Sequence, residues 1–173
     1  HKHGMAPKGA SLLLLRDGAL RRHHRFESRA WARGLYAAHT AQGTRPGGAV
    51  AAAWAVMRHL GLDGYRRCAA RIMAARAEIA AGIAAIPGLA ALPGEHAILV
   101  YRSTDPALPI AAVAEGLERR GWRVSRQQEP EGIHLHLNPL HAEVAGDYVA
   151  ALREAAAEAR GTAPARREEA RAY

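Results

Sequence analysis

The chain has 173 residues, one cysteine and a formal net charge of +8. A single cysteine excludes an internal disulfide bond and is typical of a reducing compartment, so we expect a cytoplasmic protein. No apolar run approaches the ~20 residues of a membrane-spanning helix, and we therefore expect no membrane span in this chain.

The only two lysines of the chain, Lys2 and Lys8, lie within its first nine residues. The rest of the Lys+Arg total is arginine. A desolvated amine can lose its proton and attack a carbonyl, whereas a guanidinium stays charged. This usage raises the hypothesis of a lysine that forms a Schiff base. Chance clustering of two lysines near one end is the alternative, and the spacing alone does not decide between them.

The segments that follow predict a buried element, a loop and a turn. Residues 10–15 form a run that is apolar except for Ser11, which predicts a strand buried on both faces. Residues 19–45 show no regular pattern and predict a long loop. The glycine-rich stretch 43–48 precedes a helix over 49–60, where free backbone N–H groups can bind an anion; a simple tight turn is the other interpretation.

A helical pattern then covers residues 64–86, after a break at Gly61–Gly64. Short elements follow: strands at 89–92, 97–101, 122–125 and 133–137, and helices at 109–120 and 142–160. This order predicts an α/β fold with one layer of helices on a mostly antiparallel sheet. We expect a first domain over 1–86 that ends in a long helix, a small domain over 87–161, and a flexible tail over 162–173.

The histidines and the basic charge suggest two further site classes. His134 and His136 share one face of a predicted strand, and His141 follows. No cysteine or carboxylate completes a tetrahedral ligand set, so we predict no metal site and place these histidines on the exposed face of the sheet. The net charge would allow nucleic acid or an anionic surface as a partner, but the arginines are scattered and not interleaved with aromatic residues.

Several motifs occur together in a characteristic order. They are His1-Lys2, Ala6-Pro7-Lys8-Gly9, Gly34-Leu35-Tyr36, Gly43-Thr44-Arg45-Pro46-Gly47-Gly48, Trp54, Gly64-Tyr65, Gly121-Trp122, Ile133-His134 and Leu140-His141. In this order and spacing the chain resembles the pyridoxal-phosphate enzymes of the sphingosine-1-phosphate lyase family. The resemblance implies the end of the large domain of a fold-type-I enzyme followed by its small carboxy-terminal domain. Since position 1 is histidine, we expect the chain to be a segment of a longer protein.

The resemblance also implies roles for six residues. Lys2 would be the lysine that bonds covalently to pyridoxal 5'-phosphate, and His1 would lie near the cofactor phosphate. Lys8 would lie near the phosphate or the reacting centre of the substrate. Gly43, Thr44 and Arg45 would reach the cofactor phosphate in the partner subunit, which implies a homodimer with shared active sites.

The implied activity is cleavage of a phosphorylated sphingoid base to a fatty aldehyde and phosphoethanolamine. A related amino-acid decarboxylase is the alternative, and a basic module that binds nucleic acid or anions is a more distant one. His3 stands where the lyases usually have a tyrosine, and Ala38-His39 stands where they usually have a Ser-Pro pair. Both changes would affect contacts with the substrate. The acidic partner of the pyridine nitrogen precedes the lysine in this family, so we expect the isolated chain to be inactive.

Overall fold

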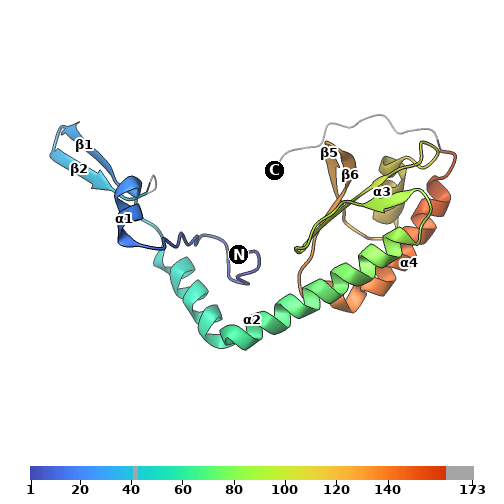
Figure 1. Ribbon diagram of the computed structural model, residues 1–173, viewed down its shortest axis with the longest axis horizontal. Helices are drawn as coiled ribbons and strands as arrows, with labels where there is room; N and C mark the ends of the chain where they lie inside the picture. The colour runs from blue at the N-terminus through green and yellow to red at the C-terminus, as the bar shows by residue number, and fades with distance from the viewer. Residues whose placement is uncertain (41–42, 163–173) are drawn as a thin grey trace. The chain divides into compact units, whose positions relative to one another are not determined.

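The computed structural model describes residues 1–40 and 43–162 and is shown as a ribbon in Figure 1. Packing divides the chain into two compact units, with the boundary between Leu62 and Asp63. The predicted domain boundary at residue 86 stays a prediction. The predicted tail lies outside the described residues except for Thr162.

The first unit contains short elements and the beginning of a long helix. These are the helix α1 (Gly18–Arg21), the 3-10 helix η1 (Arg22–His24), the strands β1 (Phe26–Trp31) and β2 (Gly34–Ala38), and the first part of α2 (Gly47–Ala84). Asp17 caps α1, because its carboxylate accepts a hydrogen bond from the Leu20 N–H at 3.1 Å.

The strands β1 and β2 form an antiparallel hairpin, so the prediction of a long loop over 19–45 is wrong. A register irregularity between Ser28 and Trp31 interrupts the pairing. The ring of Tyr36 lies 6.2 Å from that of Phe26 and 5.8 Å from that of Trp31. Cross-strand aromatic contacts of this kind stabilise a hairpin. Neither strand has a buried face, so its sequence lacks the two-residue hydrophobic period that would have revealed it.

The predicted strand over residues 10–15 is also wrong, since the structure has no strand there. Leu12, Leu13 and Leu14 are 71%, 64% and 87% exposed. A strand is stabilised by hydrogen bonds to a neighbouring strand. Among the described residues none pairs with this segment, and its apolar side chains therefore remain in solvent.

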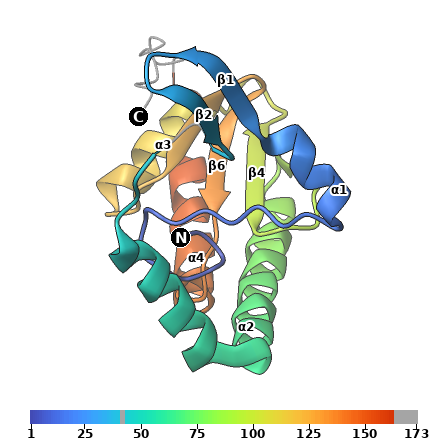
Figure 2. The same ribbon diagram turned by 90° about the vertical axis from the view of Figure 1, so that its left-hand side faces the viewer.

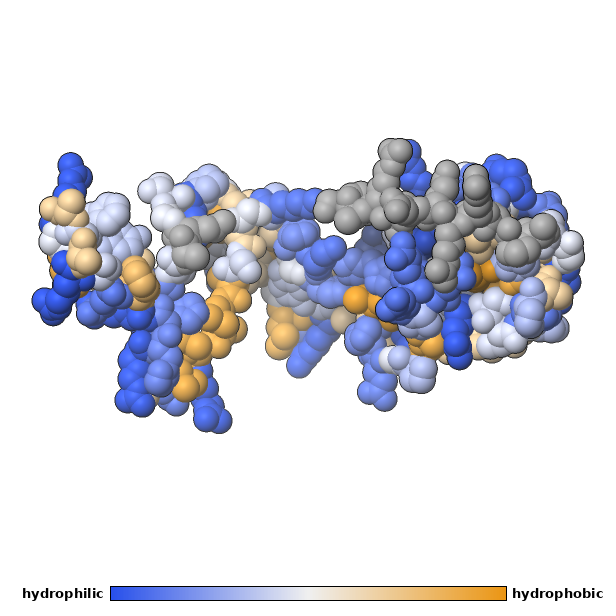
Figure 3. All heavy atoms as spheres, turned by 90° about the horizontal axis from the view of Figure 1, so that it is seen from above, coloured by the Kyte–Doolittle hydropathy of each residue, from blue (hydrophilic) through white to orange (hydrophobic). Residues whose placement is uncertain are grey.

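The first unit has no buried residue within 1–40 and 43–62. Most of its large apolar side chains are exposed, and Figure 3 shows apolar residues at the molecular surface. Val50, Trp54 and Met57 follow one another at the four- and three-residue spacing of a single helix face. The described part of this unit therefore has no hydrophobic core of its own.

The helix α2 covers both predicted helices, and the predicted break between them is confirmed at Gly61. Gly61 has φ 57° and ψ −176°, which is not a helical conformation and is accessible mainly to glycine. After this kink, Ile72, Ala75, Ile79 and Ile83 are buried along one face of the helix. The predicted helical pattern of residues 64–86 is thus confirmed at these four positions.

The second unit contains a four-stranded antiparallel sheet in the order β3-β4-β6-β5. The strands are β3 (Leu89–Ala91), β4 (Ile98–Ser103), β5 (Ser125–Gln128) and β6 (Glu131–His136), and the helices are α3 (Ile110–Arg119) and α4 (His141–Ala159). In Figure 2, β6 is seen in front of α4, and β4 lies beside β6. The predicted α/β architecture is confirmed, with β5 three residues later than expected.

Small residues bring α4 close to two other helices. A Cβ added to Gly116 on α3 would lie 2.9 Å from Ala155 Cβ and 3.2 Å from its Cα. A Cβ added to Gly82 on α2 would lie 2.5 Å from both γ carbons of Val149. The core around these crossings includes the fully buried side chains of Leu117, Leu152 and Ile83.

A pair of tyrosines joins the sheet to α4 within this core. The hydroxyls of Tyr101 on β4 and Tyr148 on α4 lie 2.6 Å apart, and both residues are buried. Burial raises the pKa of both phenols, because it disfavours the phenolate. The ring of Trp122 packs edge-on against Tyr148 at 5.2 Å.

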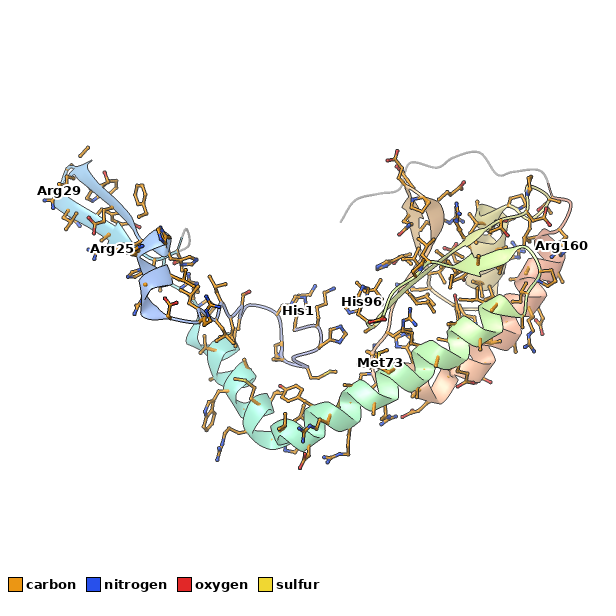
Figure 4. All side chains as sticks on the ribbon, in the orientation of Figure 1. His1, Arg25, Arg29, Met73, His96 and Arg160 are labelled. Atoms are coloured by element: carbon orange, nitrogen blue, oxygen red, sulfur yellow. The ribbon has the colours of Figure 1, made fainter. Side chains whose placement is uncertain are left out.

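Ion pairs connect the outer surfaces of α3 and α4. Arg120 pairs with Glu158 and, at 3.0 Å, with Glu154, while Arg119 lies 3.3 Å from Glu158. Hydrogen bonds from Arg120, and secondarily from Arg119, lower the pKa of Glu158 to about 2. Arg160, which follows α4 and is labelled in Figure 4, pairs with Asp105 at 3.2 Å.

Replacing Gly116 by alanine should destabilise the second unit by about 1–3 kcal/mol, because the new methyl group meets the backbone of α4. Gly146→Ala on α4 is the matched control, since its methyl would meet only the flexible end of Glu78 at 3.3 Å. Helix propensity predicts that this change is neutral or stabilises by up to about 1 kcal/mol. Urea unfolding followed by far-ultraviolet circular dichroism measures both; equal effects would contradict the packing argument.

The Glu158 ion pairs should make stability depend on acid pH. Because the pKa of Glu158 is lowered in the folded state, its ion pairs add to the free energy of unfolding at pH values above 4.5, its ordinary pKa. This stabilisation is lost as the pH falls to about 2. The difference in unfolding free energy between the unchanged chain and Glu158→Gln should therefore shrink across this window. Glu118→Gln, at a residue in no ion pair with the described residues, should show no such convergence.

Candidate functional site

All six residues predicted for the site lie in the first unit and are exposed. His1, Lys2 and Lys8 belong to the opening segment, and Gly43, Thr44 and Arg45 precede α2. The Met5 N–H donates to the Lys2 carbonyl oxygen at 3.3 Å, which closes a turn directly after the lysine. The Lys2 side chain therefore extends from a tight turn and not from a regular element.

A close contact brings the Lys8 segment to the beginning of α2. A Cβ added to Gly9 would lie 3.0 Å from Ala49 Cβ, in the first turn of the helix. Gly9 also has φ 116°, a conformation that favours glycine. The residue after Lys8 thus lies against the first turn of α2, which follows Gly43, Thr44 and Arg45 in the chain. This contact was missed in the sequence, because Ala49 lies outside the motifs and carries no functional group.

The beginning of α2 adds hydrogen-bond donors to this region. The first N–H groups of a helix have no acceptor within the helix, and the helix dipole favours an anion there. The first turn of α2 contains no acidic residue that would compete for this place. Backbone donors of this kind suit a phosphate group.

Pyridoxal 5'-phosphate requires a primary amine for its aldehyde and donors for its phosphate. Lys2 supplies an exposed amine, and the beginning of α2 supplies backbone N–H donors. The residues present therefore fit the cofactor in kind. Their assignment to individual roles remains a prediction.

The predicted histidine face of the second unit lies on β6. His134 and His136 are half-buried, and their partners in the neighbouring strand are Val100 and Ile98. Among the described residues, no group of three or more His, Cys, Asp and Glu side chains is placed to hold a metal ion. Nor does any helix in residues 1–40 and 43–162 have the length and apolarity needed to cross a membrane.

No protein-family model matches the chain. Curated relatives do: the sphingosine-1-phosphate lyase of Arabidopsis thaliana is 36% identical over 155 residues, which cover 90% of this chain and 28% of the relative. That of Saccharomyces cerevisiae is 32% identical over 154 residues, 88% of this chain and 26% of the relative. A probable L-tyrosine/L-aspartate decarboxylase of Methanothermobacter thermautotrophicus is 31% identical over 139 residues, 80% of this chain and 37% of the relative.

Among solved structures, the sphingosine-1-phosphate lyase of Burkholderia pseudomallei matches with a TM-score of 0.82 and 34% identity. The match covers 93% of this chain and 36% of that one. The α/β fold is thus that of the carboxy-terminal part of a fold-type-I enzyme. The chain belongs to the sphingosine-1-phosphate lyase family and spans about a quarter to a third of the length of the lyases that it matches.

Replacing Gly9 by valine should separate the Lys8 segment from α2, because a branched side chain would overlap Ala49 and strain the backbone. Nuclear Overhauser contacts between residues 8–9 and Ala49 should disappear. Gly4→Val is the control, because a Cβ at Gly4 meets no atom within 4 Å. Contacts that persist in Gly9→Val would show that this glycine does not position Lys8.

Proposed function

We propose that this chain is part of a pyridoxal-phosphate-dependent lyase that cleaves a carbon–carbon bond of a phosphorylated sphingoid base. The products would be a fatty aldehyde and phosphoethanolamine. The observation that carries the proposal is the similarity to several sphingosine-1-phosphate lyases over about 90% of the chain, combined with the fold. A cytoplasmic location and a homodimer with shared active sites belong to the same proposal.

The chain's own residues have distinct tasks in this proposal. Lys2 holds the cofactor covalently and then acts as a nearby base. Bound pyridoxal phosphate supplies an electron sink for the charge left when the bond breaks. His1 and the Gly43-Thr44-Arg45 turn bind the cofactor phosphate, the turn doing so in the partner subunit. Lys8, held by the Gly9 contact, binds the substrate phosphate or moves a proton at the reacting centre.

In this scheme the 173 residues do not form a complete site. The acidic partner of the pyridine nitrogen would come from residues before the cofactor lysine. The absence of buried residues in the described part of the first unit supports this view, because such a segment requires other protein to cover its apolar side chains. The isolated chain should accordingly be inactive.

The full-length protein tests the role of Lys2. It should show the visible absorbance of a protonated Schiff base. Borohydride reduction should attach the cofactor irreversibly to Lys2, and peptide mass spectrometry would identify the labelled residue. Lys2→Ala should lose both the absorbance and the covalent label. Trapping of equal amounts of cofactor in Lys2→Ala would overturn the assignment.

Lys8 is tested by two substitutions in the same protein. Lys8→Ala should keep the cofactor absorbance but lower kcat/KM by about a hundredfold or more. Lys8→Arg keeps the charge and should recover much of the activity if Lys8 binds phosphate, but not if it transfers a proton.

An amino-acid decarboxylase is the second candidate, favoured by the similarity to the archaeal decarboxylase. Product analysis separates the two functions. Release of aldehyde from a phosphorylated sphingoid base supports the lyase, whereas release of carbon dioxide from tyrosine or aspartate without aldehyde supports the decarboxylase.

A further inference from the structure

The first turn of α4 is capped by a residue that follows β6. The helix begins at His141, and its N–H donates to the Asn138 carbonyl oxygen at 3.1 Å, which extends the turn backwards to Asn138. The Asn138 side chain accepts a hydrogen bond from the Leu140 N–H at 2.9 Å. Asn138 therefore acts as the cap of this turn, and Pro139 takes the next position, where proline is favoured.

The ring of His141 forms a second hydrogen bond to this cap. The Asn138 N–H donates to His141 Nδ1 at 2.9 Å. The cap thus binds the helix through its side chain, and the helix binds the cap through a side chain three residues on, which is the reciprocal arrangement of a capping box. A capping box ordinarily has glutamate or glutamine at this third position, where a side-chain oxygen accepts the hydrogen bond. Here an imidazole takes that place.

Only the neutral form of His141 closes this box. Its Nδ1 accepts from the Asn138 N–H, so the proton of the neutral ring lies on Nε2. In the charged ring both nitrogens are donors, and the Nδ1 proton would meet the Asn138 N–H. The Asn138 carbonyl oxygen, 3.3 Å from Nδ1, already accepts from the His141 N–H. A positive charge at the beginning of a helix is also disfavoured by the helix dipole.

The side chains near His141 on α4 do not supply a compensating negative charge. Val144 and Ala145 occupy the positions three and four residues on, which share its side of the helix. Glu143, two residues on, projects from another side and pairs with Arg71 of α2 at 2.7 Å. Within residues 1–40 and 43–162, no carboxylate forms an ion pair with His141.

The elements packed around this end of α4 carry further charged and titratable groups. These are Arg76 and Glu78 on α2, Glu95 and His96 before β4, His136 on β6 and Asp147 on α4. Arg76 donates to the Gly94 carbonyl oxygen, and His96 accepts from the Ile98 N–H at 3.2 Å. The two histidines gain positive charge in acid, as His141 does, and so give its charged form no support.

The cap lies between two fixed points of the second unit. Leu137, directly before it, is buried, and its N–H donates to the Ala97 carbonyl oxygen at 2.9 Å. Directly after it, Glu143 joins α4 to α2 through Arg71. The hydrogen bonds of the cap itself are all formed within residues 138–141. They are therefore local and do not depend on which other protein segments cover this surface.

We propose that Asn138 and His141 form a pH-sensitive helix cap, which is closed while His141 is neutral and opens when His141 takes up a proton. Histidine is the side chain that ordinarily titrates between about pH 5 and 8. The cap therefore stabilises the beginning of α4 at neutral pH, and this stabilisation is lost as the pH falls through that range. The proposal depends neither on Lys2 nor on lyase activity, so either proposal can fail without the other.

Amide hydrogen exchange of the full-length protein, resolved to single residues by mass spectrometry, tests this device at about pH 7.5 and about pH 5.5. After correction for the intrinsic effect of pH on exchange, the protection of the Asn138, Leu140 and His141 amides should fall about fivefold at the lower pH, as expected for loss of a cap. The Leu152 amide, in the buried part of α4, should keep its protection. Equal protection of the three cap amides at both pH values, or none at either, would overturn the proposal.

Substitutions at two histidines separate this device from a general effect of pH. His141→Gln provides an acceptor that does not titrate, so the cap amides should stay protected at both pH values. His141→Ala removes the acceptor and should lower their protection about fivefold at both.

His96→Gln is the matched control, because His96, labelled in Figure 4, also accepts a backbone hydrogen bond but lies outside the cap. The pH dependence of the cap amides should persist in this variant. Its loss in His96→Gln, or its persistence in His141→Gln, would contradict the assignment to His141. Unchanged protection of the Leu152 amide establishes that each variant is folded.

Discussion

The second unit depends on how closely α4 approaches α2 and α3. Gly82 faces Val149 and Gly116 faces Ala155, so at both crossings a residue without a side chain meets a small or branched one. Aromatic residues are only 5% of the chain, and contact area must come from many small side chains packed at short distance. The sheet is then fixed from one side by this helix layer, through Tyr101 and Tyr148.

The sequence predicted the second unit well because its pattern reflects its own interior. Ile72, Ala75, Ile79 and Ile83 repeat at helical spacing since each of them is buried within the same unit. The first unit behaves differently: residues 10–15 are as apolar as a buried strand but lie in solvent, without a neighbour to pair with. Hydrophobic periodicity in a sequence reflects the surroundings that bury a segment. The described part of the first unit does not contain the surroundings that would bury residues 10–15.

From the sequence, only site residues that belong to the ordered motifs could be predicted. The resemblance identified Lys2, Lys8 and the Gly43-Thr44-Arg45 turn, but not the physical contact that relates two of these segments. That contact involves Gly9 and Ala49, which are 40 positions apart and carry no functional group. Likewise, Val100 and Ser125 lie opposite His134 because β6 pairs with both β4 and β5. No local sequence pattern contains this register.

The hydroxyl pair of Tyr101 and Tyr148 has a consequence for how this fold can evolve. Each phenol supplies the other's hydrogen-bond partner at 2.6 Å in the buried core. Loss of one hydroxyl leaves the other buried and unsatisfied, whereas loss of both leaves two apolar rings of nearly unchanged shape. The fitness effect of either mutation therefore depends on the residue at the other position, and divergent lineages are expected to keep both tyrosines or exchange them together.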